Sequence, residues 1–214
     1  QVMVFPRIMN KVPLAVLAAA GVVGGVVAGI IWFWGSPKHT DVGYSPKQPI
    51  AFSHRVHVGD LGMDCSFCHN TVEQTAVAPL PSGESCMSCH AFVKKDSEGV
   101  KRLAAAVAKN EPIPWVRVHR LPDYARFHHG VHVQAGVSCL SCHGRIARMP
   151  QVRQVEPLSM SWCLDCHRAP EAQLRPVHLV TKLDAVIPDP LATGKLLKDL
   201  KRIKPSTDCS ACHQ

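Results

Sequence analysis

Aromatic residues are scarce in this sequence, at 6% of 214 positions, and nowhere do they alternate with basic residues. Nucleic-acid-binding surfaces combine the two types, so the formal net charge of +8 does not indicate a nucleic-acid partner. Few aromatic side chains also leave little material for an ordinary side-chain core. The 17 prolines and 14 glycines instead favour a loop-rich chain.

Charge is missing from the stretch Val12–Trp34, which as a helix would be about 35 Å long and would span a bilayer. A Trp-Phe-Trp sequence closes it as an interfacial belt, and Arg7 and Lys11 precede it, which predicts a cytoplasmic N-terminus. A cleaved signal peptide is the alternative, but the run is long for one and lacks a small-residue cleavage site. We therefore predict a membrane anchor over residues 1–37 and an extracytoplasmic domain over residues 38–214.

Three glycines of this stretch, Gly21, Gly25 and Gly29, recur every four residues. They form one small-residue face, a pattern that favours close packing against another membrane helix. Glycine is also generally frequent in membrane helices, which is the simpler explanation. We favour a packed partner helix, and therefore a subunit of a membrane complex.

No cysteine of this chain stands outside one motif, because all ten fall in five copies of Cys-x-x-Cys-His. This is the attachment signal of haem c, in which two thiols bind the porphyrin and the adjacent histidine becomes the proximal iron ligand. Zinc sites also use Cys-x-x-Cys pairs but do not require a histidine after each. We predict five covalently bound haem c groups, with thioethers at Cys65, Cys68, Cys86, Cys89, Cys139, Cys142, Cys163, Cys166, Cys209 and Cys212 and proximal ligands His69, His90, His143, His167 and His213.

The motif Phe-x-His-x-Val-His-Val occurs twice, beginning at Phe52 and at Phe127. Each copy precedes two haem motifs, so residues 52–90 and 127–167 are interpreted as a duplicated di-haem module, with a fifth haem at 209–213. Two histidines three apart lie on adjacent faces of a helical turn and reach different irons. We predict four distal iron ligands from this repeat: His54, His57, His129 and His132.

A fifth distal ligand is needed, and two candidates are open. His119 lies in an alternating, strand-like stretch that begins at Trp115. Met149 is its rival, and a thioether ligand would raise the potential of its haem relative to bis-histidine ligation. Met160 is a weaker candidate because it stands close to its own haem motif. No ligand role is assigned to the remaining histidines, His39, His128 and His178.

Two helices are expected between the motifs. One runs from Ser97 to Asn110 and stops before Pro112. The other runs from Gly194 to Ile203 with its leucines on one face and lysines on the other, an amphipathic pattern that favours packing on protein or haem over a docking patch. The overall prediction is a loop-rich multihaem cytochrome c with short helices wrapped around five haems, plus one N-terminal transmembrane helix.

The Phe-x-His-x-x-His repeat resembles the start of the small multihaem cytochromes of sulfate reducers. In those proteins the first histidine ligates the haem next in sequence and the second ligates a more distant one. By this resemblance His54 would pair with His69 and His129 with His143. His57 and His132 would reach other haems.

The strings WVRVHRLPDYARFHHGVHV and EPLSMSWCLDCHRAPE, with the anchor and five motifs, resemble the pentahaem cytochrome subunit of alternative complex III. The resemblance covers nearly the whole chain. It implies the distal ligand set named above, with Met149 as a possible thioether ligand. It also implies a quinol-oxidising membrane complex with a polytopic quinol-binding subunit, an iron–sulfur subunit and a monohaem cytochrome c. Members commonly continue beyond the last motif, so we expect either a longer chain or a short member.

No Cys-x-x-Cys-Lys occurs, which argues against a multihaem nitrite reductase. If every iron is six-coordinate, the chain is an electron-transfer subunit and not an enzyme by itself. We expect it in the cytoplasmic (inner) membrane as a single-pass protein in contact with lipid, with its haem domain periplasmic and its electrons passing to a periplasmic acceptor in a respiratory or photosynthetic chain. The alternative is a membrane-anchored multihaem quinol dehydrogenase acting directly on quinol.

Overall fold

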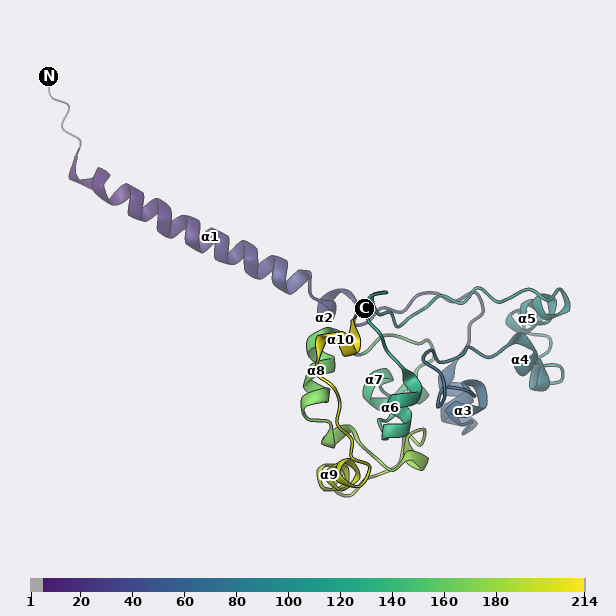
Figure 1. Ribbon diagram of the computed structural model, residues 1–214. Coiled ribbons are helices and arrows are strands. Elements are labelled where there is room, and N and C mark those ends of the chain that lie inside the picture. The colour runs from purple at the N-terminus through teal and green to yellow at the C-terminus, as the bar shows by residue number, and fades with distance from the viewer. Residues whose placement is uncertain (1–5, 214) are drawn as a thin grey trace. The chain divides into compact units, whose positions relative to one another are not determined.

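The computed structural model describes residues 6–213, so residues 1–5 of the predicted anchor and the terminal Gln214 lie outside it. The chain divides into two compact units, Gln1–Asp41 and Val42–Gln214. The first unit holds η1 (Arg7–Lys11), α1 (Val12–Trp34) and α2 (Pro37–Thr40). Within it, α1 is one uninterrupted helix (Figure 1).

Helix α1 has the expected bounds. A proline at its first turn fits a helix start, and the Gly35 N–H closes its last turn on Ile31. Together with the turn before it, the helix is long and apolar enough to cross a membrane. A signal sequence passes the same test, so the helix is a candidate anchor or signal sequence.

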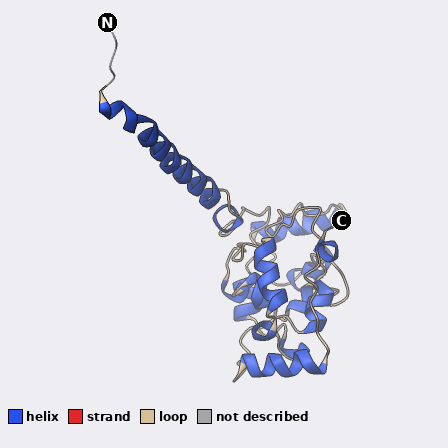
Figure 2. Cartoon of the chain, turned by 60° about the vertical axis from the view of Figure 1, so that its left-hand side comes forward, coloured by secondary structure: helices blue, strands red, loops and turns tan. Residues whose placement is uncertain are grey.

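The second unit is built from short helices and connecting loops, and residues 42–213 contain no β-strand (Figure 2). Isolated bridges join Ala125 to His213 and Val137 to Leu174. The elements are η2 (Arg55–Asp60), α3 (Cys65–Cys68), α4 (Gly83–His90), α5 (Glu98–Ala108), α6 (His129–Ala135), α7 (Cys139–His143), η3 (Ile146–Arg148), α8 (Met160–Arg168), η4 (Glu171–Gln173), η5 (Val177–Leu179), α9 (Pro190–Leu200) and α10 (Cys209–Cys212).

The two expected helices between the motifs are confirmed with shifted ends. Helix α5 begins after Ser97, whose hydroxyl accepts the Val100 N–H, and packs Leu103 against α4. Helix α9 begins four residues earlier than expected because Asp189 caps it by accepting the Ala192 N–H.

The strand-like character predicted for the segment after Trp115 is wrong. The backbone of Val116 does not pair with another strand. Its N–H and carbonyl bond instead to the side-chain amide of Gln48, each at 2.9 Å. One amide side chain thus satisfies both backbone groups, and the segment that carries His119 remains extended but irregular.

Among residues 6–213 the buried hydrophobic side chains are few for a unit of this length. They are Val72, Val100, Leu103, Val133, Met149, Leu174 and Val180.

Helix α9 is held against η4 by a close backbone approach, which yields a stability prediction. A Cβ on the buried Gly194 would collide with the backbone of Glu171. The side-chain carboxylate of Glu171 also pairs with Lys198 of α9, at 2.5 Å. We expect Gly194→Ala to destabilise the domain by about 1–3 kcal/mol, because the rigid backbone must shift. Urea unfolding of the holo-domain measures this.

A matched control is Gly99→Ala in α5, where the nearest atom is Ile50 Cγ2 at 3.4 Å. This change removes backbone freedom from the unfolded chain without a serious clash, so stability should hold or rise by up to about 1 kcal/mol. Equal unfolding midpoints for the two variants would contradict the packing of α9 on η4.

Candidate functional site

Each Cys-x-x-Cys-His motif lies on a short helical turn: α3, α4, α7, α8 or α10 (Figure 1). The local sequence explains this, because a serine or aspartate stands immediately before each turn. In the first four, its side chain accepts a backbone N–H of the new turn. The turn places both cysteines on one side, with the histidine following directly. The capping residues are Asp64, Ser82, Ser138 and Ser159, while Asp208 precedes the fifth turn without such a bond.

Seven histidines of the site are oriented by the backbone. In each, ring Nδ1 lies within hydrogen-bonding distance of a carbonyl oxygen, which only accepts, so Nδ1 carries the proton. The lone pair is therefore on Nε2, the arrangement typical of histidines that bind metal through Nε2. The Nδ1–oxygen pairs are His57–Ser53 (2.9 Å), His69–Pro79 (2.6 Å), His90–Val93 (2.9 Å), His129–Ala76 (2.8 Å), His132–His128 (2.9 Å), His167–Ser206 (2.6 Å) and His213–Tyr124 (3.2 Å).

Predicted distal and proximal histidines meet in pairs. An iron bound by two imidazoles separates their ring centroids by about 6 Å, since each metal–nitrogen bond is about 2 Å long and the centroid lies about 1 Å behind the nitrogen. Three pairs have this spacing: His57–His90 at 6.1 Å, His132–His167 at 6.1 Å and His129–His143 at 6.4 Å with nearly parallel rings. Both second histidines of the repeat thus face haem motifs distant in sequence.

The repeated phenylalanine supports both histidines of each copy. Phe52 stacks on His57 at 4.4 Å and meets His54 edge-on at 4.9 Å. The second copy repeats this, because the ring of Phe127 lies 4.6 Å from His132 and 4.7 Å from His129. The expected helical turn is present in both copies, as η2 in the first and α6 in the second.

The remaining candidate ligands gather around the first and third motifs. Burial lowers the pKa of His54 to about 4, with nearby His69 and His57 adding to the effect. Burial also lowers the pKa of His143 to about 3, and among its neighbours His119 has the largest influence. These imidazoles are therefore neutral at neutral pH, as iron ligation requires.

His119 is close to this group but in a different geometry. Its ring lies 4.4 Å from that of His143, edge to face, which is shorter than the spacing of two ligands on one iron. Its Nε2 atom and the Nδ1 atom of His54 are buried without a hydrogen-bond partner in the described part of the chain. Both histidines thus retain an unused nitrogen. The assignment of His119 as the fifth distal ligand stays a prediction.

Met149 is buried, with 5% of its surface exposed, and its carbonyl accepts the Arg55 N–H of η2. It therefore lies beside the first histidine turn and remains the rival ligand. Met160 is 65% exposed. Of the histidines without an assigned role, His128 caps α6 by accepting the Val131 N–H, and His178 is exposed.

The cysteine thiols show which motifs are neighbours. The Cys139 thiol of the third motif has the largest influence on the pKa of Cys65, which it lowers, so the first and third motifs are neighbours. Burial and the neighbouring Cys86 thiol of the second motif raise the pKa of Cys68. The first motif therefore lies between the second and the third.

The other end of the site follows the same pattern. Burial and the thiols of the fourth motif, Cys166 and Cys163, raise the pKa of Cys142 to about 12. Burial and Cys212 of the fifth motif raise the pKa of Cys163. The spatial order of the motifs is thus second, first, third, fourth, fifth, which sequence spacing did not predict.

Asp64 ties the first motif to the segment after η5. It accepts hydrogen bonds from Thr181 Oγ1 at 2.9 Å and Lys182 Nζ at 2.7 Å, besides both donors of Ser66. Burial raises the pKa of this carboxyl, but the bonds from Lys182, Ser66 and Thr181 outweigh burial and hold the pKa well below its ordinary value. All four of these groups are hydrogen-bond donors to Asp64, so they favour its ionised carboxylate form.

A pH prediction follows from this depressed pKa. The ion pair should contribute stability that is complete above about pH 4, the ordinary carboxyl range, and is lost as the pH falls below it. Asp64→Asn should lower the free energy of unfolding by about 1 kcal/mol at pH 7, because the new amide group points N–H donors at Lys182 and Thr181, which are donors themselves. The loss is no larger because the ion pair is partly exposed to solvent. Urea unfolding at pH 7 and pH 3 measures this. A difference between wild type and variant that grows on acidification would contradict the assignment.

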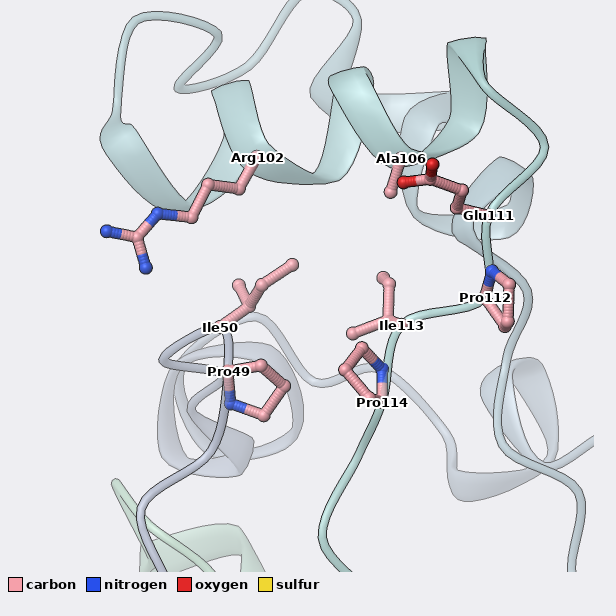
Figure 3. Close-up of a pocket in the computed structure, with 8 residues that line it drawn as sticks. All are labelled: Pro49, Ile50, Arg102, Ala106, Glu111, Pro112, Ile113 and Pro114. Carbon is pink, nitrogen blue, oxygen red and sulfur yellow. The ribbon is translucent and has the colours of Figure 1, made fainter.

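A shallow cavity of about 160 Å³ lies apart from the predicted ligands, between α5 and two extended segments (Figure 3). Ile50 and Ile113 form its apolar floor, and Arg102 and Glu111 stand at its sides. It contains none of the residues predicted from the sequence.

Comparison with known proteins shows the family of the chain. The sequence matches the family described as cytochrome c7 and related cytochrome c over residues 50–109 and 125–214. It is 40% identical over 128 residues to the menaquinone reductase multihaem cytochrome c subunit of Nitratidesulfovibrio vulgaris, a match that covers 59% of this chain and 59% of the relative. The chain belongs to the cytochrome c7 and related cytochrome c family, whose prosthetic group is covalently bound haem c.

Proposed function

We propose that this cytochrome is an electron-transfer subunit of a quinone-linked membrane complex and holds five haem c groups. The observation that carries the proposal is the set of histidine pairs spaced for one iron each, the closest at 6.1 Å. His54 and His119 each have a buried ring nitrogen without a hydrogen-bond partner in the described residues, and imidazole nitrogen is a common iron ligand. The chain's residues therefore fit the prosthetic group.

Haem c, when bound, supplies a one-electron Fe(III)/Fe(II) couple. The ten cysteines would anchor it, and the five motif histidines would ligate its iron from one side. The distal set comes from His54, His57, His129 and His132, with His119 or Met149 completing it. Carbonyl acceptors on Nδ1 fix the ring orientations and increase ligand basicity. Phe52 and Phe127 cover the distal histidines and limit the access of water.

With every site six-coordinate, the chain's role is to space its centres and tune their potentials. The order of neighbouring motifs makes a row whose two ends are the second motif, in α4, and the fifth, in α10. Partners that give or take electrons would then dock near these ends. A row of one-electron centres works in either direction, and the potentials of the partners set which one.

We further propose that α1 anchors the subunit in the cytoplasmic membrane, with its N-terminus cytoplasmic and its haem domain periplasmic. The complex would be alternative complex III, with a polytopic quinol-binding subunit, an iron–sulfur subunit and a monohaem cytochrome c. The relative in Nitratidesulfovibrio vulgaris is named as a subunit of a menaquinone reductase, which supports a quinone-linked complex. Within it this chain would relay electrons from quinol towards a periplasmic acceptor.

The test is purification in mild detergent with identification of the subunits that accompany the chain. We expect a polytopic membrane subunit and an iron–sulfur subunit, and a mass that includes five covalently bound haems. The isolated chain should not oxidise quinol, whereas the complex should. Quinol oxidation by the isolated chain would indicate a quinol dehydrogenase and not an electron relay. A mass without bound haem would refute both functions.

A further inference from the structure

The guanidinium of Arg175 has one buried nitrogen whose donor is unused. Its Nη1 atom is buried and has no hydrogen-bond partner in the part of the chain that the structure describes. An arginine side chain stays protonated in proteins, so an unpaired buried guanidinium carries a large desolvation cost. This cost indicates an anion that the polypeptide itself does not supply.

The surrounding backbone holds Arg175 beside the third haem motif. Its N–H donates to the Gly136 carbonyl at 2.9 Å, and the adjacent Leu174 bridges to Val137. Leu174, between Gln173 and Arg175, is extended and directly follows η4. Gln173 accepts a hydrogen bond from Ser141, which lies inside the third motif, so this segment lies against the motif.

Two carboxylates of the domain that contains Arg175 pair with lysines. Asp64 pairs with Lys182 at 2.7 Å, and Glu171 pairs with Lys198 at 2.5 Å. None of the ion pairs formed by the described residues includes Arg175. An acidic side chain of the described chain therefore does not neutralise it.

We infer that Arg175 binds a propionate carboxylate of a haem at or beside the third motif. This inference rests on the proposed function, because it needs haem in the chain. Haem carries carboxylates at its edge, and the planar guanidinium matches a carboxylate with two parallel N–H bonds. A buried positive charge at that edge favours the reduced state, so Arg175 acts as a positioning residue that raises the potential of one haem.

The experiment is a spectroelectrochemical titration of the holo-protein for wild type and Arg175→Gln. We expect the equilibrium constant for reduction of one haem to fall about tenfold, which is ~59 mV for a one-electron couple, while all irons stay low-spin. Arg168→Gln is the control, since Arg168 follows the ligand His167 but its side chain is 64% exposed. Solvent screens the charge of Arg168, so the haem potentials of Arg168→Gln should equal those of the wild type.

If Arg175→Gln does not accumulate as folded protein, Arg175→Lys carries the test. Lysine keeps the charge but loses the paired donors, so the same potential should fall by a smaller amount, about two- to fivefold in the constant. If an Arg175 variant binds haem and its haem potentials are unchanged, the inference about Arg175 is wrong, while the proposed function stands. The same holds if Arg168→Gln lowers a haem potential by as much as Arg175→Gln does. A wild-type chain without covalent haem would instead refute the proposed function together with this inference.

Discussion

The variant His57→Ala should convert one haem, the one attached at Cys86 and Cys89, from low-spin to high-spin. His57 faces His90 with a ring separation of 6.1 Å, the spacing of two imidazoles on one iron. Alanine cannot ligate, so that iron becomes five-coordinate while the other four keep both ligands. Electron paramagnetic resonance of the oxidised protein should show one high-spin signal among five haems.

The affected haem belongs to the second motif, although the first motif is the one that follows His57 in sequence. This makes the prediction specific. His132→Ala should act in the same way on the haem of His167, whose ring is also 6.1 Å away. Added imidazole should restore the low-spin spectrum in both variants by filling the space that the side chain leaves. The exposed His178 provides the control, because His178→Ala should leave every haem low-spin. A low-spin spectrum in His57→Ala would show that His57 is not a ligand.

The sequence predicted those parts of the site that are local. Four of the five motif turns are capped by the serine or aspartate that precedes them, and the repeat around Phe52 and Phe127 follows from packing of one ring on two histidines. The bounds of α1 follow from an uncharged run that ends before Gly35. In each case the interacting groups are less than a few turns apart in the chain, so their spacing carries the information.

Long-range features were not predictable in this way. The neighbourhood of the Cys65 and Cys139 thiols joins residues far apart in the chain, and no periodicity encodes it. The irregular segment at Val116 was mistaken for a strand because a single Gln48 side chain replaces a partner strand. The unused donor of Arg175 has no sequence signal, since the sequence has many basic residues and only burial distinguishes this one.

The distal ligands illustrate the boundary between the two cases. His54, His57, His129 and His132 were predicted as distal ligands because the motif repeats, whereas His119 stands outside any repeat. Its ring touches that of His143 at 4.4 Å, which no spacing rule anticipates.

Removal of the first haem should divide the row of centres. The variant Cys65→Ala/Cys68→Ala prevents attachment at the first motif, which lies between the second and the third. The haem of His90 then loses its nearest neighbour. After an electron is injected by pulse radiolysis, this haem should no longer equilibrate rapidly with the three haems of the later motifs, although a mass measurement should still find four haems bound.

The matched variant Cys209→Ala/Cys212→Ala also leaves four haems but removes an end of the row, since the fifth motif is next to the fourth. Its four remaining haems should equilibrate as fast as they do in the intact chain. The comparison isolates position in the row from haem number, because each variant loses one group. Equal equilibration in the two variants would mean that electrons bypass the first motif, and the order second, first, third, fourth, fifth would then not be the path that they follow.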